Sequence, residues 1–243
     1  MNQHLAKLGD WIVDDDWPDT ICPFCRSVTL SLQAIEDLPT AESTVLQQTH
    51  ESWEPHWISG KFRGVLHCNA KRCGEDVLVT GEMRVIEVAD HQRNIDYDSA
   101  YLLRFAQPPL PLIEFHDNCP ESIQQHVDKA AALLWADPGA TAGRLRFAVE
   151  QLLTELGDTS RRPLARRISE LKATKPDVAI TLQAVKWLGN QGVHEATLTV
   201  RDVLDGVKLL EHALDLLYKH PQMEALANQI NADRGVRRST VTP

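Results

Sequence analysis

Four of the five cysteines occur in two close pairs, and thiol pairs of this kind are typical metal ligands. Cys22 and Cys25 are separated by two residues, a tight turn that lets both sulfurs reach one ion. Cys68 and Cys73 form a looser pair, and Gly74 relieves the turn after the last ligand. Because Zn²⁺ takes four such ligands at tetrahedral corners, we predict one zinc site made by all four thiols.

A shell of four thiolates leaves no coordination position open, which predicts a structural rather than a catalytic Zn²⁺. His67 is an alternative to Cys68, followed by His50 and His56. Four ordinary thiols without a metal and a redox role are the competing interpretations. Cys119 has no partner in the sequence, so we expect it to be a small core residue or a free thiol.

The composition narrows the class of protein. A chain of 243 residues that is 43% hydrophobic can bury a substantial core, and a net charge of -9 argues against coating nucleic acid or anionic membrane over the whole surface. The N-terminus is acidic, and no stretch approaches the roughly 20 apolar residues that span a bilayer. We therefore expect a cytoplasmic protein without a membrane partner, in a reducing compartment that favours a metal site over disulfides.

The first part of the chain is rich in short runs typical of β-strands, and a proline-rich segment follows it. The sequence QPPLPL should form a stiff, extended connector because proline fixes φ. We predict a β-rich, zinc-ribbon-like domain over residues 1–106, a connector over 107–119 and a helical bundle over 120–243. The β-rich runs are Val28–Ala34, Lys61–His67, Asp76–Val88 and Tyr101–Phe105.

After the connector the apolar residues recur at helical spacing. About five helices are predicted, the fourth running from Pro176 toward His194 and the fifth beginning with a Thr199/Asp202 capping pair. A short further helix is expected after Pro221. The predicted fold class is thus α+β: a small zinc-ribbon-like domain followed by an all-α, up-and-down bundle of about five helices.

The fourth predicted helix carries an unusual polar face. If Val178, Leu182 and Val185 form its core stripe, four other residues lie about 120° to 180° away on the helical wheel. Each glycine inside a helix costs about 1 kcal/mol relative to alanine, so Gly189 and Gly192 imply close approach of a helix from the same bundle or a second copy. Fraying of the helix at Gly189 is the alternative. The predicted dimer face is Gln183, Trp187, Asn190 and His194.

The spacing Arg146-x-x-x-Glu150, followed on a later helix by the run from Trp187 to His194 (WLGNQGVH), resembles an uncharacterised prokaryotic family with a cysteine-rich head. That family is placed in the HEPN superfamily of nucleotide-binding helical bundles, and the resemblance covers about residues 100 to 220. It implies a homodimer with the histidine helix at the interface. Many HEPN proteins are metal-independent endoribonucleases of toxin or antiviral systems.

The resemblance makes Asn190 and His194 candidate catalytic residues, because they match the polar residue and the histidine of the HEPN motif. Gly189 stands where that motif has arginine. Cleavage needs a cation or donor to stabilise charge developing on phosphate, and a histidine cannot also move the proton alone. Lys186 can substitute only with help from a dimer partner.

Local charge leaves nucleic acid as a candidate ligand. Residues 141–190 contain nine Lys or Arg and five Asp or Glu, a balance of +4. Such clusters bind phosphates without reading sequence, although a solvated surface with internal ion pairs is an equal alternative. We expect an i, i+4 ion pair between Arg146 and Glu150 to be structural. The candidate nucleic-acid-binding residues are Arg161, Arg162, Arg166, Arg167 and Lys186.

Three functional hypotheses follow. The first is a zinc-containing, HEPN-like component of a prokaryotic defence or toxin system that binds RNA, DNA or partner proteins without chemistry of its own. The second is a metal-independent endoribonuclease that uses His194. The third is a protein-only adaptor or dimerisation module.

Overall fold

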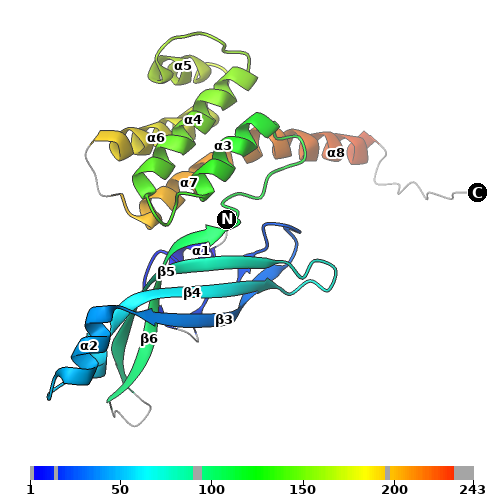
Figure 1. Cartoon of the computed structure of the whole chain (residues 1–243). Coiled ribbons are helices and arrows are strands. Elements are labelled where there is room, and N and C mark those ends of the chain that lie inside the picture. The colour runs from blue at the N-terminus through cyan, green and yellow to red at the C-terminus, as the bar shows by residue number, and fades with distance from the viewer. Residues whose placement is uncertain (1–2, 14–15, 90–94, 195–197, 233–243) are drawn as a thin grey trace, which may run out of the picture.

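The computed structural model describes residues 3–13, 16–89, 95–194 and 198–232; the side chains of Gln3, His4, Val193 and His194 lie outside that description. An antiparallel β-sheet comes first and a group of helices follows, so the chain is α+β as expected. In Figure 1 the sheet lies below the helices, and the segment after β6 connects the two parts.

Six strands form one antiparallel sheet in the order β1-β6-β5-β4-β3-β2, and this sheet curls like half of a barrel (Figure 1). The same part of the chain holds α1 (Gln3–Lys7), α2 (Ala41–Thr49) and the 3₁₀ turn η2 (Pro55–Trp57). The strands are β1 (Ile12–Val13), β2 (Thr20–Ile21), β3 (Thr29–Pro39), β4 (Ser59–Cys68), β5 (Asp76–Ala89) and β6 (Ile95–Gln107).

Alternation of apolar and polar residues accounts for the long central strands. In β5, Val77, Val79 and Met83 are buried, and the residues between these inward positions are exposed. Gly81 completes the inward row, where a Cβ would clash with the Leu102 carbonyl oxygen of β6. The β5–β6 register shifts beside Gly81, so this bulge lets the two strands bend together.

The prediction of a small zinc-ribbon-like domain is wrong. The β-rich runs are parts of longer strands that pair along most of their length, such as residues 30–39 of β3 with residues 60–68 of β4. Charged residues on the outer face, including Glu36 and Arg63, interrupt the apolar pattern and hide the ends of the strands in the sequence. The cysteine pairs occupy turns at one end of this sheet and do not define a domain by themselves.

The helices pack around α4, which contacts α3, α5, α6 and α7. Asp137 caps α4 by accepting a hydrogen bond from the Ala140 backbone N–H, and the predicted Thr199/Asp202 capping box at the start of α7 is confirmed. Within the described ranges, no helix combines the length and the apolar character needed to cross a membrane. The helices are α3 (Glu121–Ala131), α4 (Pro138–Glu155), α5 (Leu164–Leu171), α6 (Pro176–His194), α7 (Val200–Leu214) and α8 (His220–Ala232).

The predicted bundle of about five helices also needs correction. In the described part of the chain after residue 120 there are six α-helices and a π-helical turn, η3 (Asp215–Lys219), which joins α7 directly to α8. Pro221 does not end the helical run, because it is the second residue of α8 and follows the π-helical turn directly. None of the residues of α8 is buried, and α8 extends away from the other helices in Figure 1.

The segment between the sheet and the helices is part of the core. Leu110, Leu112 and Ile113 are buried in a single apolar cluster that includes residues of both parts. The Arg104 guanidinium of β6 donates a hydrogen bond to the backbone carbonyl oxygen of Trp135 at 3.4 Å. Sheet and helices therefore pack directly on each other.

Candidate metal centre and the α4–α6 face

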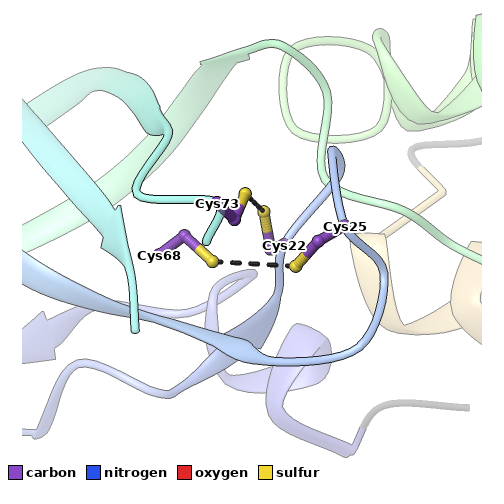
Figure 2. Close-up of side chains that lie close together, drawn as sticks. All are labelled: Cys22, Cys25, Cys68 and Cys73. Atoms are coloured by element: carbon purple, nitrogen blue, oxygen red, sulfur yellow. Dashed lines mark hydrogen bonds between the residues drawn. The ribbon is translucent and has the colours of Figure 1, made fainter. Parts of the chain in front are cut away.

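The four paired cysteines come together at one end of the sheet. Cys22 and Cys25 lie in the turn between β2 and β3, whereas Cys68 ends β4 and Cys73 lies in the turn before β5. Figure 2 shows the four side chains pointing toward a common centre. The Sγ atoms of Cys22 and Cys73 are 3.8 Å apart, those of Cys25 and Cys68 are 3.7 Å apart, and all four lie within 4.8 Å of one another.

Strand register brings the two turns together. Leu30 of β3 pairs with Cys68 of β4, so the turn before β3 and the turn after β4 lie side by side. Each turn is closed by its own backbone hydrogen bonds: the Arg26 N–H donates to the Cys22 carbonyl, and the Gly74 N–H donates to the Ala70 carbonyl. Gly74 has a φ of 59°, the left-handed conformation that glycine adopts at little cost.

The sulfur spacing fits one metal ion and no disulfide. All four thiols are free, and a disulfide would need sulfurs about 2.05 Å apart. Four sulfurs bound to Zn²⁺ at about 2.3 Å lie about 3.8 Å apart at tetrahedral corners. The sulfur–sulfur separations of 3.7 and 3.8 Å match that edge. The cluster is therefore a candidate metal centre whose ligand set is the one expected from the sequence.

The electrostatics of the four thiols differ. Hydrogen bonding from the backbone of Ser27 lowers the pKa of Cys25 to about 6. Burial is the main reason that the pKa of Cys22 is raised.

The group of metal-binding side chains does not include His67, whose Nδ1 lies 2.7 Å from a carboxylate oxygen of Asp76. Cys119 is buried apart from the cluster, and burial raises its pKa to about 11.

The glycines of α6 are explained by close packing on α4 of the same chain. We call this contact, with the side chains beside it, the α4–α6 face. A Cβ on Gly189 would lie 2.6 Å from the Arg146 Cβ, and a Cβ on Gly192 would lie 2.5 Å from the Gly139 carbonyl oxygen. The expected Arg146–Glu150 ion pair is confirmed, with nitrogen and oxygen 3.1 Å apart. The close approach expected at these glycines therefore comes from another helix of the same bundle.

A polar group lies on α6 beside this contact. The side chain of Lys186 is buried, and its ammonium nitrogen is 3.8 Å from the centre of the Trp187 ring. Burial first, and the charge of Arg146 second, lower the pKa of Lys186. With the Gln183 amide oriented to satisfy its neighbours, its oxygen accepts hydrogen bonds from Lys186 Nζ at 2.7 Å and Trp187 Nε1 at 3.0 Å.

The predicted dimer face is partly open. The side chain of Trp187 is 57% exposed, and Ile180, two helical turns earlier on the same side of α6, is 61% exposed. Gln183 and Asn190 are half-buried. His194 is the last residue of α6, and its side chain lies outside the described part of the structure.

The predicted arginine cluster divides into surface and interior residues. Arg167 is buried, and its guanidinium donates hydrogen bonds to the carboxylate of Asp158 at 3.2 Å and to Thr154 Oγ1 at 3.1 Å. Arg162 and Arg166 both pair with Glu170. Arg161 is exposed. Phosphate binding stays a prediction for the three exposed arginines, whereas Arg167 has a structural position.

The sequence does not predict one further contact of Arg146. Beyond its ion pair with Glu150, the Arg146 side chain packs against Gly189. Its Nε atom is buried and has no hydrogen-bond partner among the described residues. The i, i+4 spacing of Arg146 and Glu150 predicts their ion pair. No feature of the sequence shows that Arg146 of α4 contacts Gly189, which comes 43 residues later in α6.

Two family models match the chain, and each is described as a domain of unknown function. DUF8608 matches residues 12–109, and DUF4145 matches residues 128–233. The first match covers the sheet, and the second begins in α3 and covers the helices that follow. No curated protein and no solved structure matches the chain.

Proposed function

We propose that the four-cysteine cluster holds one structural Zn²⁺ that fastens the β2–β3 turn to the β4–β5 turn. The spacing of the sulfurs, 3.7 and 3.8 Å, is the observation that supports this proposal. Four protein ligands fill the tetrahedral shell, so the ion has no open position for a substrate. Its role is to stabilise the end of the sheet that faces α3, where Arg26 lies 3.8 Å from the Asp128 carboxylate.

Metal counting tests the proposed zinc ion. Wild-type protein purified without added metal should carry one zinc per chain, and Cys22→Ser should lose it. Cys119→Ala is the matched control, because Cys119 is also a buried thiol but lies outside the cluster. Equal zinc content in all three proteins would contradict the assignment of ligands.

For the whole chain we propose a HEPN-like component that binds nucleic acid or a partner protein and has no chemistry of its own. The resemblance of the α4 and α6 motifs supports the HEPN assignment, and the exposed Ile180 and Trp187 support dimerisation through α6. The +4 balance of residues 141–190 supports contact with nucleic acid phosphates. A role in prokaryotic defence or toxin systems follows from the resemblance and predicts nuclease, helicase or modification genes beside this one.

The cations of the α4–α6 face favour binding without catalysis. Gly189 takes the place of the arginine that a HEPN endoribonuclease uses, and charge on a cleaved phosphate must be stabilised by some donor. Lys186 is buried against Trp187, and Arg146 is paired with Glu150. Both cations described on this face are thus already engaged by protein groups.

RNA binding and cleavage separate this proposal from its rivals. Structured RNA should be retained by the wild type in a salt-dependent way, remain uncut in EDTA, and be retained less by Arg161→Glu/Arg162→Glu/Arg166→Glu. Lys7→Glu/Lys61→Glu/Arg63→Glu reverses the same number of exposed charges in the N-terminal part of the chain, away from the cysteines, and is the control. Retention of neither RNA nor DNA would favour the protein-only adaptor.

An endoribonuclease is the second candidate, because Arg146 lies against Gly189 and its Nε lacks a partner. In that case α4 supplies the cation that α6 lacks, and His194 moves the proton. EDTA-resistant cleavage that is lost in both His194→Ala and Arg146→Gln would establish this activity and overturn the binding-only proposal.

A further inference from the structure

A second group of metal-binding side chains lies at the opposite end of β4 from Cys68. His56 belongs to η2, which precedes β4, and Glu54 is the residue before η2. Glu87 comes from β5, the neighbour of β4 in the sheet. The His56 Nδ1 atom is 3.3 Å from a carboxylate oxygen of Glu54 and 3.4 Å from one of Glu87. The three ligand atoms all lie within 4.8 Å of one another.

Hydrogen bonding does not account for this arrangement. A histidine Nδ1 carries at most one hydrogen, so it cannot donate to two carboxylates in different directions. Neither contact has the geometry of a hydrogen bond, in contrast to His67, which bonds Asp76 at 2.7 Å. Two carboxylates this close also repel each other unless a cation lies between them, a role that the ion pairs with His56 or a metal ion can fill. The charges of Glu87 and Glu54 add to burial in raising the pKa of nearby Tyr97.

The distances fit a metal ion. Zn–N and Zn–O bonds of about 2.0–2.2 Å place the ligand atoms about 3.3–3.5 Å apart at tetrahedral corners. The two separations from His56 Nδ1, 3.3 and 3.4 Å, fall in that range. An imidazole with two carboxylates suits Zn²⁺ and its neighbours better than Mg²⁺ or Ca²⁺, which prefer oxygen alone.

The backbone already holds the ligands in place. Pro55 begins the 3₁₀ turn, and the Trp57 N–H donates to the Glu54 carbonyl oxygen at 3.1 Å. The Val85 N–H of β5 donates to the Ile58 carbonyl oxygen at 3.0 Å, which fastens the end of η2 to the strand that carries Glu87. Hydrogen bonds thus hold together the backbone segments that carry the three side chains before any ion binds.

We infer that Glu54, His56 and Glu87 form a second metal site, which takes one exchangeable Zn²⁺ or similar transition-metal ion. Its three protein ligands leave at least one coordination position open to water or to a ligand oxygen. The three side chains are between 37% and 55% exposed, so the ion exchanges with solvent and binds less tightly than at the four cysteines. The site is independent of the zinc proposed at the cysteines.

Calorimetric titration of the full chain with Zn²⁺ tests the inference. Wild type should bind one more Zn²⁺ than Glu54→Gln/Glu87→Gln, or bind its last Zn²⁺ more than about tenfold more tightly. The matched control is Glu36→Gln/Glu82→Gln, two exposed glutamates of the same sheet that pair with arginines. This control should bind Zn²⁺ as wild type does. Equal stoichiometry and affinity in all three proteins would overturn the site.

Tryptophan emission gives a second readout in the wild-type chain. The Trp57 ring centre is 6.4 Å from that of His56, so Co²⁺ at this site should quench Trp57. Trp57→Phe should bind Co²⁺ equally well in calorimetry and lose this part of the quenching. Wild-type emission that stays constant while Co²⁺ is added would contradict the inference, as would quenching that Glu54→Gln/Glu87→Gln retains. A simple ion pair of His56 predicts that the response of the emission to Co²⁺ is the same in wild type and in Glu54→Gln/Glu87→Gln.

Discussion

The cysteine end of the sheet and the α4–α6 face reach close packing by opposite means. At the cysteine end, four side chains meet because strand register places two turns side by side, and the sulfurs leave room for an ion. On the α4–α6 face, the helices meet because Gly139, Gly189 and Gly192 lack side chains. The comparison teaches that the first contact gathers four sulfur atoms that, in our proposal, bind one ion, whereas the second depends on the absence of side-chain atoms.

Removal of the metal should have the largest effect. Structural zinc sites contribute apparent binding free energies of about 10–16 kcal/mol at neutral pH, so a strong chelator or Cys68→Ser should unfold much of the sheet. The helices pack through their own apolar faces and should persist. Circular dichroism with hydrogen exchange measures both parts. Equal loss of protection in sheet and helices would mean that both regions depend on the metal.

Gly189→Ala tests the packing of the second region. The new methyl group would lie 2.6 Å from the Arg146 Cβ, and overpacking costs about 1–3 kcal/mol, against the roughly 1 kcal/mol that alanine gains in a helix. We expect net destabilisation in urea unfolding. Gly143→Ala in α4 is the control: a Cβ there meets nothing within 4 Å, so it should be stabilising. The same sign for both variants would contradict the proposed contact.

Trp187→Ala should change association more than stability. The indole is 57% exposed, so its loss should alter the free energy of unfolding of one chain by less than about 1 kcal/mol while the dimer dissociates. Light scattering at micromolar concentration measures this. Phe105→Ala on the sheet removes a ring of similar exposure, 55%, and should leave the dimer intact. A wild-type monomer would remove the dimer proposal altogether.

The smallest effect is expected from a charge in the helical part. Hydrogen bonds from Ser160, followed by Arg167, lower the pKa of Asp158 from an ordinary 3.8 to about 2. The folded state thus prefers the carboxylate, and its stabilisation is complete above about pH 4 and lost as the pH falls to 2. Asp158→Asn should be less stable than wild type at pH 7 and equal to it near pH 2, by urea unfolding. A difference in stability between the two proteins that is the same at pH 7 and at pH 2 would contradict this preference for the carboxylate.

The features that can be predicted from the sequence differ between the two regions. The ligands at the cysteine end are recognisable because few residue types bind metals, but the surrounding sheet is not, since charges on its outer face such as Glu36 mask the strand pattern. In the helical part the reverse holds. Capping residues and apolar spacing identify the helices, whereas the position of Arg146 against Gly189 depends on how α4 and α6 pack. Such long-range alignment leaves no local signal.

The convergence of two distant turns on one ion is tested most directly by X-ray absorption at the zinc edge of the purified chain. One zinc surrounded by four sulfurs at about 2.3 Å is the predicted result. A sample without zinc, or a tightly held zinc with oxygen or nitrogen among its ligands, would contradict the assignment of Cys22, Cys25, Cys68 and Cys73 as its complete shell.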